Sequence, residues 1–224
     1  MTITKKTRLL PPFIGTRIKI KLDDPESLTW GMRILDLEEG HEKAVIEWGD
    51  GTSTEMTESG LLTHTYAKVG EYEVRISDDI EALACSNRGT DEYSAVYAPM
   101  IREVRTSATL LEALNTTCFR NAANMRTFTC KGSSVKSIAN GAFTGCTSLA
   151  GRIDLPCVLS ITETAFRDSP DITELHFGAA NAAIITALPG YDTAFGAENA
   201  VIRPLTAKRN SRPARLSRAS RGDL

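Results

Sequence analysis

Two segments in the second half of the chain carry the same order of small, aromatic and aliphatic residues, 23 positions apart. The matched pairs are Ile138 and Ile161, Ala142 and Ala165, Phe143 and Phe166, and Leu149 and Ile172. A fixed period in the twenties is typical of stacked repeat proteins, in which every period adds one coil to the stack. This repeat therefore constrains the fold more strongly than local helix or strand propensity does.

A second pattern extends the repeat toward the N-terminus: an apolar residue followed by apolar positions three and five residues later. Four successive sets carry it, the first only loosely and the third with one extra residue: Ile101, Val104 and Thr106; Met125, Phe128 and Cys130; Leu149, Ile153 and Leu155; and Ile172, Leu175 and Phe177. Each set predicts a short strand with alternate side chains inside the stack. The Ala-Phe units between the strands predict a turn of helix that buries its phenylalanine between coils, because no coil can bury its apolar side alone.

The first third of the chain has the alternation expected of half-buried strands. Apolar and basic residues alternate along Thr16–Leu22, and the inward positions of Glu71–Ile76 are again apolar or aromatic. Between them, Gly49-Asp50-Gly51 is a tight-turn signal, because glycine accepts positive φ and aspartate bonds to the backbone that follows it. Several short strands separated by turns predict a small β-sandwich.

The residues of this sandwich carry a family resemblance. Trp48–Thr52, His64–Tyr66 and Gly70–Val74 resemble three successive motifs of the polycystic-kidney-disease (PKD) domain, although the residue pair that usually separates the family's Trp and Gly is missing. The resemblance implies an immunoglobulin-like sandwich of the kind found in extracellular and surface proteins. It also implies structural roles in the core, corner or turn, and no ligand contact, for Trp48, Tyr66, Tyr72 and Asp50.

The repeats carry a second resemblance. Ile138, Ala142, Phe143, Cys146 and Leu149 match the spacing of the BspA-type leucine-rich repeat of bacterial surface proteins, and the next unit departs from it at Ser169, where cysteine is usual. The resemblance covers about residues 100–203. It implies a solenoid used for adhesion or other protein binding.

The expected fold is therefore mainly β with short helices, a β-sandwich followed by a short leucine-rich-repeat solenoid. The expected segments are an N-terminal arm at residues 1–14, the PKD-like sandwich at 15–85, the solenoid with its caps at 86–203, and a basic, disordered tail at 204–224.

Bulk properties argue against several classes of function. The formal net charge of −2 gives the whole chain no attraction for nucleic acid, and no apolar run reaches the roughly 18 residues of a membrane span. The N-terminus shows no export signal. The five cysteines are odd in number and include no CxxC pair, which favours mostly buried thiols over a metal site or a disulfide framework. They are Cys85, Cys118, Cys130, Cys146 and Cys157.

Catalytic motifs are absent from the sequence. The three histidines lie in separate segments, and no nucleophile elbow, HExxH motif or phosphate loop is present. We therefore expect no enzymatic activity, no cofactor and no metal. Asp78-Asp79 could assist a Ca²⁺ ion, but a solvated pair is favoured, and the tripeptide Arg221-Gly222-Asp223 in a basic tail is expected to be accidental.

The first functional hypothesis is a surface-exposed binding or adhesion protein that recognises a protein or glycan through outward residues of the repeat strands. Strand alternation predicts these residues to be Arg126, Thr127, Thr129, Arg152, Asp154, Thr173, Glu174 and His176. The alternative is a structural or receptor-binding component of a bacteriophage tail or virion, with assembly partners in a larger particle. The lack of a signal peptide motivates this alternative, because such proteins reach the outside without one.

Overall fold

A computed structural model describes residues 13–37, 43–84, 95–130 and 132–205, and the fold is mainly β with few, short helices. The strands are β1 (Gly15–Leu22), β2 (Thr29–Leu37), β3 (Ala44–Glu47), β4 (Ser53–Met56), β5 (Gly60–Thr65), β6 (Gly70–Ser77), β7 (Ile80–Ala84), β8 (Ile101–Thr106), β9 (Ala113–Leu114), β10 (Thr127–Thr129), β11 (Ser137–Ile138), β12 (Gly151–Leu155), β13 (Ser160–Ile161), β14 (Ile172–Gly178) and β15 (Val201–Leu205). The helices are η1 (Ala98–Met100), η2 (Ala179–Asn181), α2 (Ala182–Thr186) and η3 (Tyr191–Gly196).

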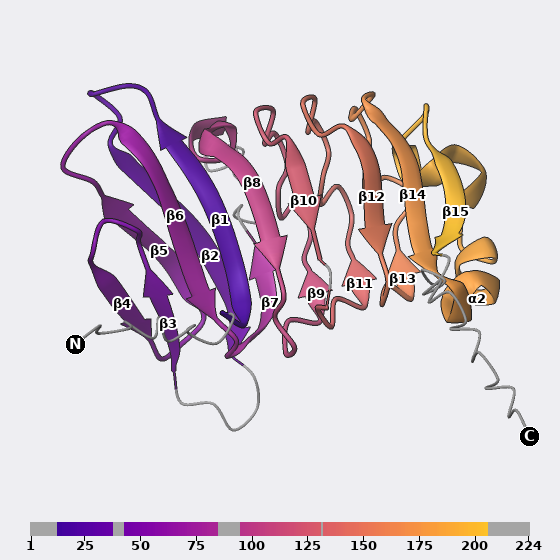
Figure 1. The fold of residues 1–224 in the computed structure, drawn as a ribbon, viewed down its shortest axis with the longest axis horizontal. Helices are drawn as coiled ribbons and strands as arrows, with labels where there is room; N and C mark the ends of the chain where they lie inside the picture. Colours follow the sequence, from indigo (N-terminus) through magenta and orange to yellow (C-terminus); the bar gives the residue numbers. More distant parts are fainter. Residues whose placement is uncertain (1–12, 38–42, 85–94, 131, 206–224) are drawn as a thin grey trace, which may run out of the picture.

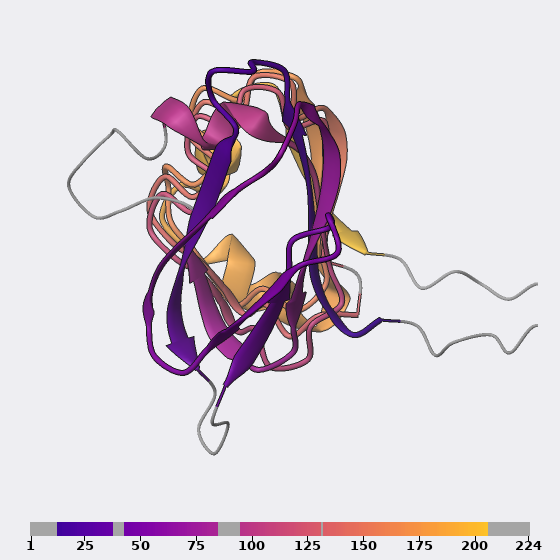
Figure 2. The same ribbon diagram turned by 90° about the vertical axis from the view of Figure 1, so that its left-hand side faces the viewer.

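The N-terminal strands form two layers that enclose an apolar core (Figure 2). In one layer β1 pairs antiparallel with β6, and in the other β2 pairs antiparallel with β5 and β7. The alternation expected along β1 is confirmed, because Ile18, Ile20 and Leu22 are buried while Arg17 and Lys19 are more accessible. Hydrophobic alternation thus sets which face of each strand meets the core.

Both layers continue into the repeats, as Figure 1 shows along the long axis of the molecule. Strand β8 pairs antiparallel with β1 on one side and parallel with β10 on the other. Strand β7 likewise pairs antiparallel with β2 and parallel with β9, which is followed by β11 and β13. The strand orders are β10-β8-β1-β6-β3-β4 and β13-β11-β9-β7-β2-β5, and a third sheet has the order β12-β14-β15. The expected boundary between residues 85 and 86 stays a prediction, and strands from before and after it belong to the same two sheets.

The repeat registers predict the buried face of the coils correctly. Every residue of the four sets is buried, including Thr106, whose hydroxyl accepts a hydrogen bond from that of Thr16 at 2.9 Å. The strands β8, β10, β12 and β14 contain or adjoin these sets. Strand β15 adds a further parallel strand and ends at Leu205, two residues beyond the expected end of the solenoid.

The turn of helix expected at each Ala-Phe unit is wrong. Residues 116–121, 140–145 and 163–168 form turns. Left-handed φ values recur within them, for example 62° at Asn121, 73° at Gly145 and 57° at Asp168, and these interrupt a right-handed helix. The amides instead bond to the next coil: Phe143 N donates to Ala165 O at 2.8 Å.

The phenylalanines of these turns are buried and pack against one another. The ring of Phe143 is fully buried and lies 5.4 Å from the ring of Phe119 and 5.0 Å from that of Phe166, measured between centroids. These rings join the same apolar core as Trp30 and Trp48 of the N-terminal layers. The core is therefore continuous from the first strands to the last coil.

Ser169 replaces the usual cysteine of its repeat without losing the hydrogen bond. Its hydroxyl is buried and donates to Phe143 O at 2.8 Å, whereas the thiol of Cys146 donates to Phe119 O at 3.2 Å one coil earlier. Both side chains satisfy a carbonyl of the preceding turn. The departure from the repeat pattern is therefore conservative in physical terms.

We predict that Ser169→Ala lowers the free energy of unfolding by about 1–2 kcal/mol, because Phe143 O loses a buried donor. Ser169→Cys is the matched control and should cost less, since a thiol supplies the same donor. Chemical denaturation followed by circular dichroism measures both. A loss from Ser169→Cys as large as that from Ser169→Ala would contradict this role.

Several expectations concern segments near or beyond the described residues. Residues 95–98 contain a helical turn that leads into η1. Outside the described residues lie His41, Cys85, residues 1–12 of the arm, residues 206–224 of the tail and the Arg221–Asp223 tripeptide. None of the four described cysteines forms a disulfide bond, and three of them are buried.

Candidate binding face

The outward faces of β12, β14 and β15 bring together four of the eight residues predicted to bind a ligand. Parallel pairing places Arg152 opposite Glu174, and Asp154 opposite His176. The next strand adds Arg203 beside His176. Because alternate residues of a strand share a face, these five side chains lie on the face opposite the core residues Ile153 and Leu175. We call them the outer cluster.

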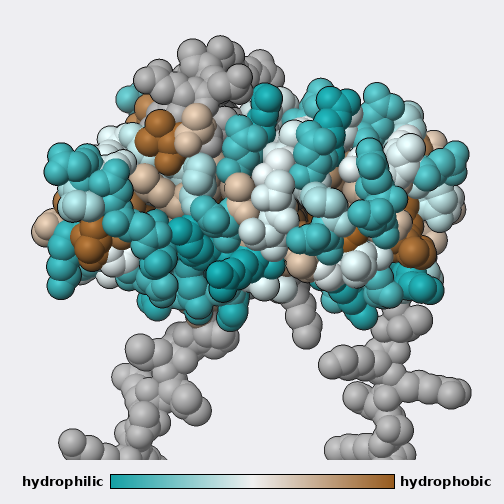
Figure 3. Space-filling model, turned by 90° about the horizontal axis from the view of Figure 1, so that it is seen from above, coloured by the Kyte–Doolittle hydropathy of each residue, from teal (hydrophilic) through white to brown (hydrophobic). Residues whose placement is uncertain are grey.

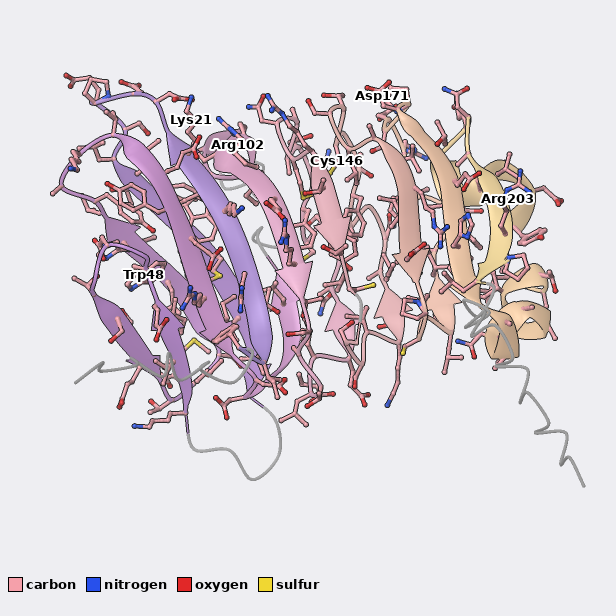
Figure 4. All side chains as sticks on the ribbon, viewed as in Figure 1. Lys21, Trp48, Arg102, Cys146, Asp171 and Arg203 are labelled. Atoms are coloured by element: carbon pink, nitrogen blue, oxygen red, sulfur yellow. The ribbon has the colours of Figure 1, made fainter. Side chains whose placement is uncertain are left out.

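Ion pairs connect most of the outer cluster. The Nε of Arg152 donates to Oδ1 of Asp154. Glu174 accepts a hydrogen bond from Nε2 of His176 at 2.7 Å, and its Oε1 forms an ion pair with Nε of Arg203 at 3.4 Å. Figure 4 labels Arg203 on β15 at the C-terminal end of the stack. The two acids and the basic side chains thus form a surface of mixed charge held on neighbouring strands.

These contacts shift the pKa values of two members of the cluster, Glu174 and Arg152. A hydrogen bond from His176 outweighs the opposing effect of burial, and together with the charges of Arg203 and Arg152 it lowers the pKa of Glu174. The pKa of Arg152 is raised, first by its hydrogen bond to Asp154 and then by the charges of Asp154 and Glu174. Glu174 therefore stays ionised to a lower pH than an isolated glutamate.

His176 is less accessible than its strand position suggested. Alternation predicted an exposed side chain that points away from the core, yet the residue is only 7% accessible. The register places Asp154 and Arg203 of the neighbouring strands directly opposite it. Its Nδ1 atom is buried and has no hydrogen-bond partner among the described residues. His176 positions Glu174 and presents little surface of its own.

The other four predicted residues do not join the outer cluster. Thr127 and Thr129 are exposed on β10, where the register places them beside Glu103 and Arg105 of β8. Arg126 is exposed and immediately precedes β10. Thr173 is exposed where the register between β12 and β14 shifts, so simple alternation does not fix its direction.

Sequence reasoning missed Arg203 as a site residue. It is the last residue of the expected solenoid, and no outward-facing site was predicted there. The apolar segment Ala200–Ile202 could have indicated a further strand. If Ile202 faces the core of that strand, the next residue, Arg203, faces outward.

A second polar constellation lies at the turn between β3 and β4 and is structural. Oδ1 of Asp50 accepts from the backbone N–H of Thr52 at 3.0 Å and from its hydroxyl at 2.6 Å, and Oδ2 lies 2.7 Å from Nε2 of His64. The ring of His64 stacks on Trp48 with centroids 4.9 Å apart. The hydroxyl of Tyr66 donates to Trp48 O at 3.0 Å. These bonds hold the turn as expected for structural residues.

The turn requires glycine at its first position. Gly49 has φ of 85°, and a Cβ atom there would lie 2.7 Å from the carbonyl oxygen of Glu73. Backbone conformation and space therefore both exclude a larger residue, in agreement with the tight turn expected at Gly49-Asp50-Gly51.

The Asp50 contacts predict a pH dependence of stability. The pKa of Asp50 is lowered from 3.8 to about 2. The largest cause is the hydrogen bond from the Thr52 hydroxyl, and the hydrogen bond from His64 adds to it, while burial has a smaller, opposite effect. The folded state therefore binds this proton more weakly than the unfolded state, so the stabilisation is complete above about pH 4 and is lost as the pH falls toward 2. We expect Asp50→Asn to flatten that part of the stability curve, measured by thermal unfolding between pH 2 and 6. An unchanged slope would contradict the assignment.

The remaining reactive groups offer little chemistry. Among the described residues no group of three or more His, Cys, Asp or Glu side chains is arranged to hold a metal ion. Burial raises the pKa of the Cys130 thiol to about 12, and it raises that of Cys146 as well, so neither is a ready nucleophile. No helix in the described part of the chain is long and apolar enough to cross a membrane.

Comparison with known families identifies the repeats. Residues 99–188 match the family model described as "BspA type Leucine rich repeat region (6 copies)". No curated protein and no solved structure matches the chain. The matched residues run from η1 to two residues beyond α2 and include Arg152, Asp154, Glu174 and His176 of the outer cluster. Residues 99–188 are therefore a BspA-type leucine-rich repeat region.

Proposed function

We propose that this chain is a non-enzymatic, surface-exposed binding protein that recognises a protein or glycan through the outer cluster. The observation that carries the proposal is the set of ion pairs that fixes Arg152, Asp154, Glu174 and Arg203 on neighbouring parallel strands. Groups held by strands and by each other lose little conformational freedom when a ligand binds. The leucine-rich repeat region supports a binding role.

The chemistry of the outer cluster favours a polar ligand. Charged side chains predominate on this face, and the one exposed large hydrophobic residue on β12, β14 and β15 is Val201, which the register places beside Glu174. The view from above in Figure 3, which shows a different side of the molecule, has mostly hydrophilic residues with scattered hydrophobic ones. Hydroxyl-rich or charged surfaces match such a face better than an apolar peptide does.

The N-terminal strands contribute an anchor in this proposal. The PKD-like reading assigns them to an immunoglobulin-like sandwich, a module of extracellular and surface proteins. Their sheets pair directly with the first repeat strands β8 and β9 and cover one end of the stack. A terminal cap of this kind is needed because an end coil would otherwise expose its apolar face.

A charge-matched pair of double variants tests the proposal. Glu174→Gln with Arg203→Gln removes one acid and one base from the outer cluster and leaves the net charge unchanged. Lys43→Gln with Glu55→Gln removes an exposed ion pair, 2.6 Å long, from the N-terminal strands and serves as the control. The full chain is screened on a glycan array and on an array of extracellular-matrix proteins.

We expect the cluster variant to bind the selected ligand at least tenfold more weakly, because the ligand loses two charged partners, while the control changes its affinity less than twofold. Equal affinities for both variants would place the ligand elsewhere. A larger loss in the control would assign binding to the N-terminal strands and leave the repeats as a spacer.

A further inference from the structure

We propose that a second site, a shallow pocket where the N-terminal strands meet the repeats, binds a single carboxylate or sulfate group. The pocket has a volume of about 410 Å³ and opens on the outer face of β1, β8 and β10. The residues used below are Phe13, Arg17, Glu103, Arg105, Thr127 and Thr129, all of which line it. The site goes beyond the proposed function, because it contains no member of the outer cluster.

A row of three arginines crosses this face. Antiparallel pairing places Arg75 of β6 opposite Arg17 of β1, and Arg17 opposite Arg105 of β8. Directly opposite residues on one face of a sheet have Cβ atoms about 4.5–5.5 Å apart, and like charges at that distance destabilise the sheet. Such a row is stable only where neighbouring acids or a bound anion compensate it.

Acids compensate the two outer arginines. Arg75 donates to Glu73 at 2.9 Å and lies 3.8 Å from Glu47. Arg105 pairs with Glu103. Glu103 also binds Lys19 at 2.9 Å, so a single carboxylate serves two cations. Partial burial raises the pKa of Glu103, but the hydrogen bonds from Lys19 and Arg105 together outweigh this effect and lower the pKa overall. The carboxylate of Glu103 therefore stays charged.

The middle arginine is compensated differently. Within the described part of the chain, the contact of the Arg17 guanidinium is with the Phe13 ring, whose centroid lies 5.1 Å away. The same ring lies 5.8 Å from the guanidinium of Arg75. An aromatic ring orients a guanidinium by cation–π attraction but supplies no hydrogen-bond acceptor. Arg17 therefore keeps its fork of N–H donors for a group in the pocket.

Hydroxyl donors complete the pocket wall. Thr127 and Thr129 are exposed on β10, beside Glu103 and Arg105, and their hydroxyls make no hydrogen bond within the described residues. The hydroxyl of Ser107 donates to Phe13 O at 3.2 Å, which fixes the segment that carries the aromatic ring. A guanidinium fork with adjacent hydroxyls matches the planar or tetrahedral oxygens of a carboxylate or sulfate.

The charge balance argues for one anionic group rather than a polyanion. Glu103 lines the pocket and would repel a second negative group. The chain as a whole carries a net charge of −2, which gives it no attraction for a nucleic acid backbone. A terminal carboxylate or an isolated sulfate ester, such as those of acidic sugars, has the required chemistry.

NMR spectroscopy of the ¹⁵N-labelled full chain tests the site with sodium sulfate, sodium acetate and sodium chloride at matched ionic strength. We expect the amide signals of Thr127 and Thr129 to shift to saturation with sulfate or acetate and not with chloride. The anion that saturates shows whether the natural group is a sulfate or a carboxylate.

Arg17→Gln should raise the apparent Kd for that anion at least tenfold, and Arg17→Lys, which keeps the charge but loses the fork, should raise it less. Arg167→Gln, at an exposed arginine of a distant turn, is the control and should leave the Kd unchanged. Shifts that grow linearly with salt, equal shifts with chloride, or an unchanged Kd in Arg17→Gln would overturn the proposal. Both Arg17 variants should keep the affinity of the outer cluster for its own ligand, so the two proposals fail separately.

Discussion

Replacing Phe143 by alanine should lower the free energy of unfolding by about 3–5 kcal/mol. The ring is fully buried and touches the phenylalanine rings of three other segments, with the centroid of Phe128 4.8 Å away in addition to those of the two neighbouring turns. Alanine leaves a cavity between coils that their backbone hydrogen bonds prevent from closing. Chemical denaturation followed by circular dichroism gives the value.

Two controls separate cavity formation from other effects of Phe143→Ala. Phe143→Leu keeps most of the apolar volume and should cost clearly less. Leu159→Ala removes a more accessible side chain, 37% exposed, from the connection before β13 and should cost about 1 kcal/mol or less. A change near zero for Phe143→Ala would contradict the stacking of coils on this ring.

Replacing Asp78 by alanine should lower the free energy of unfolding by about 2–3 kcal/mol. The Asp78 carboxylate accepts from the backbone N–H of Thr109 at 2.8 Å, from the Thr109 hydroxyl at 2.6 Å and from the N–H of Leu110 at 3.0 Å. It thereby ties the end of β6 to the loop between β8 and β9. The expectation of a solvated Asp78 is wrong for this residue, because its oxygens are occupied by the loop.

Asp78→Asn should cost less than Asp78→Ala, because the amide oxygen still accepts from the loop. The same variants address the Ca²⁺ alternative raised by the Asp78-Asp79 pair. If the carboxylate serves the loop, added Ca²⁺ leaves the melting temperature of the unsubstituted chain unchanged. A rise with Ca²⁺ that disappears in Asp78→Ala would show a metal site instead.

The repeat made the core of the coils predictable. Ile138 and Phe143 recur with a period that only a stack satisfies, so their burial followed from the sequence. The backbone conformation of the turns could not be predicted in the same way. Gly141 and Gly145 signal left-handed φ values in one turn, but Thr117 and Asn121 take such values in another turn without being glycine. Non-glycine residues at positive φ are uncommon, and here bonds between coils impose them.

The strands at the junction were hidden for a different reason. β7 is short and contains two alanines, so its alternation is weak and no separate strand was predicted there. Strands β9, β11 and β13 have two residues each, which is too short to show any period. Their pairing depends on the neighbouring coil rather than on their own composition.

The candidate site was predictable only in part. Alternation placed Arg152, Asp154 and Glu174 on one outward face, and the structure brings them together. Alternation could not predict that His176 is buried, or that Arg17 and Arg105 lie opposite each other on paired strands although they are 88 residues apart in sequence. Such contacts require the register between strands, which a single sequence does not contain.

Continuity of the sheets and core across the junction is tested most directly by tryptophan fluorescence of the Phe143→Ala variant during denaturant unfolding. Both tryptophans of the chain, Trp30 and Trp48, lie in the N-terminal layers, whereas Phe143 lies in the repeats. If one cooperative body unfolds, the fluorescence midpoint falls together with the circular-dichroism midpoint in the variant. A fluorescence midpoint that stays at its original value while the circular-dichroism transition splits in two would show independent domains and contradict a shared core.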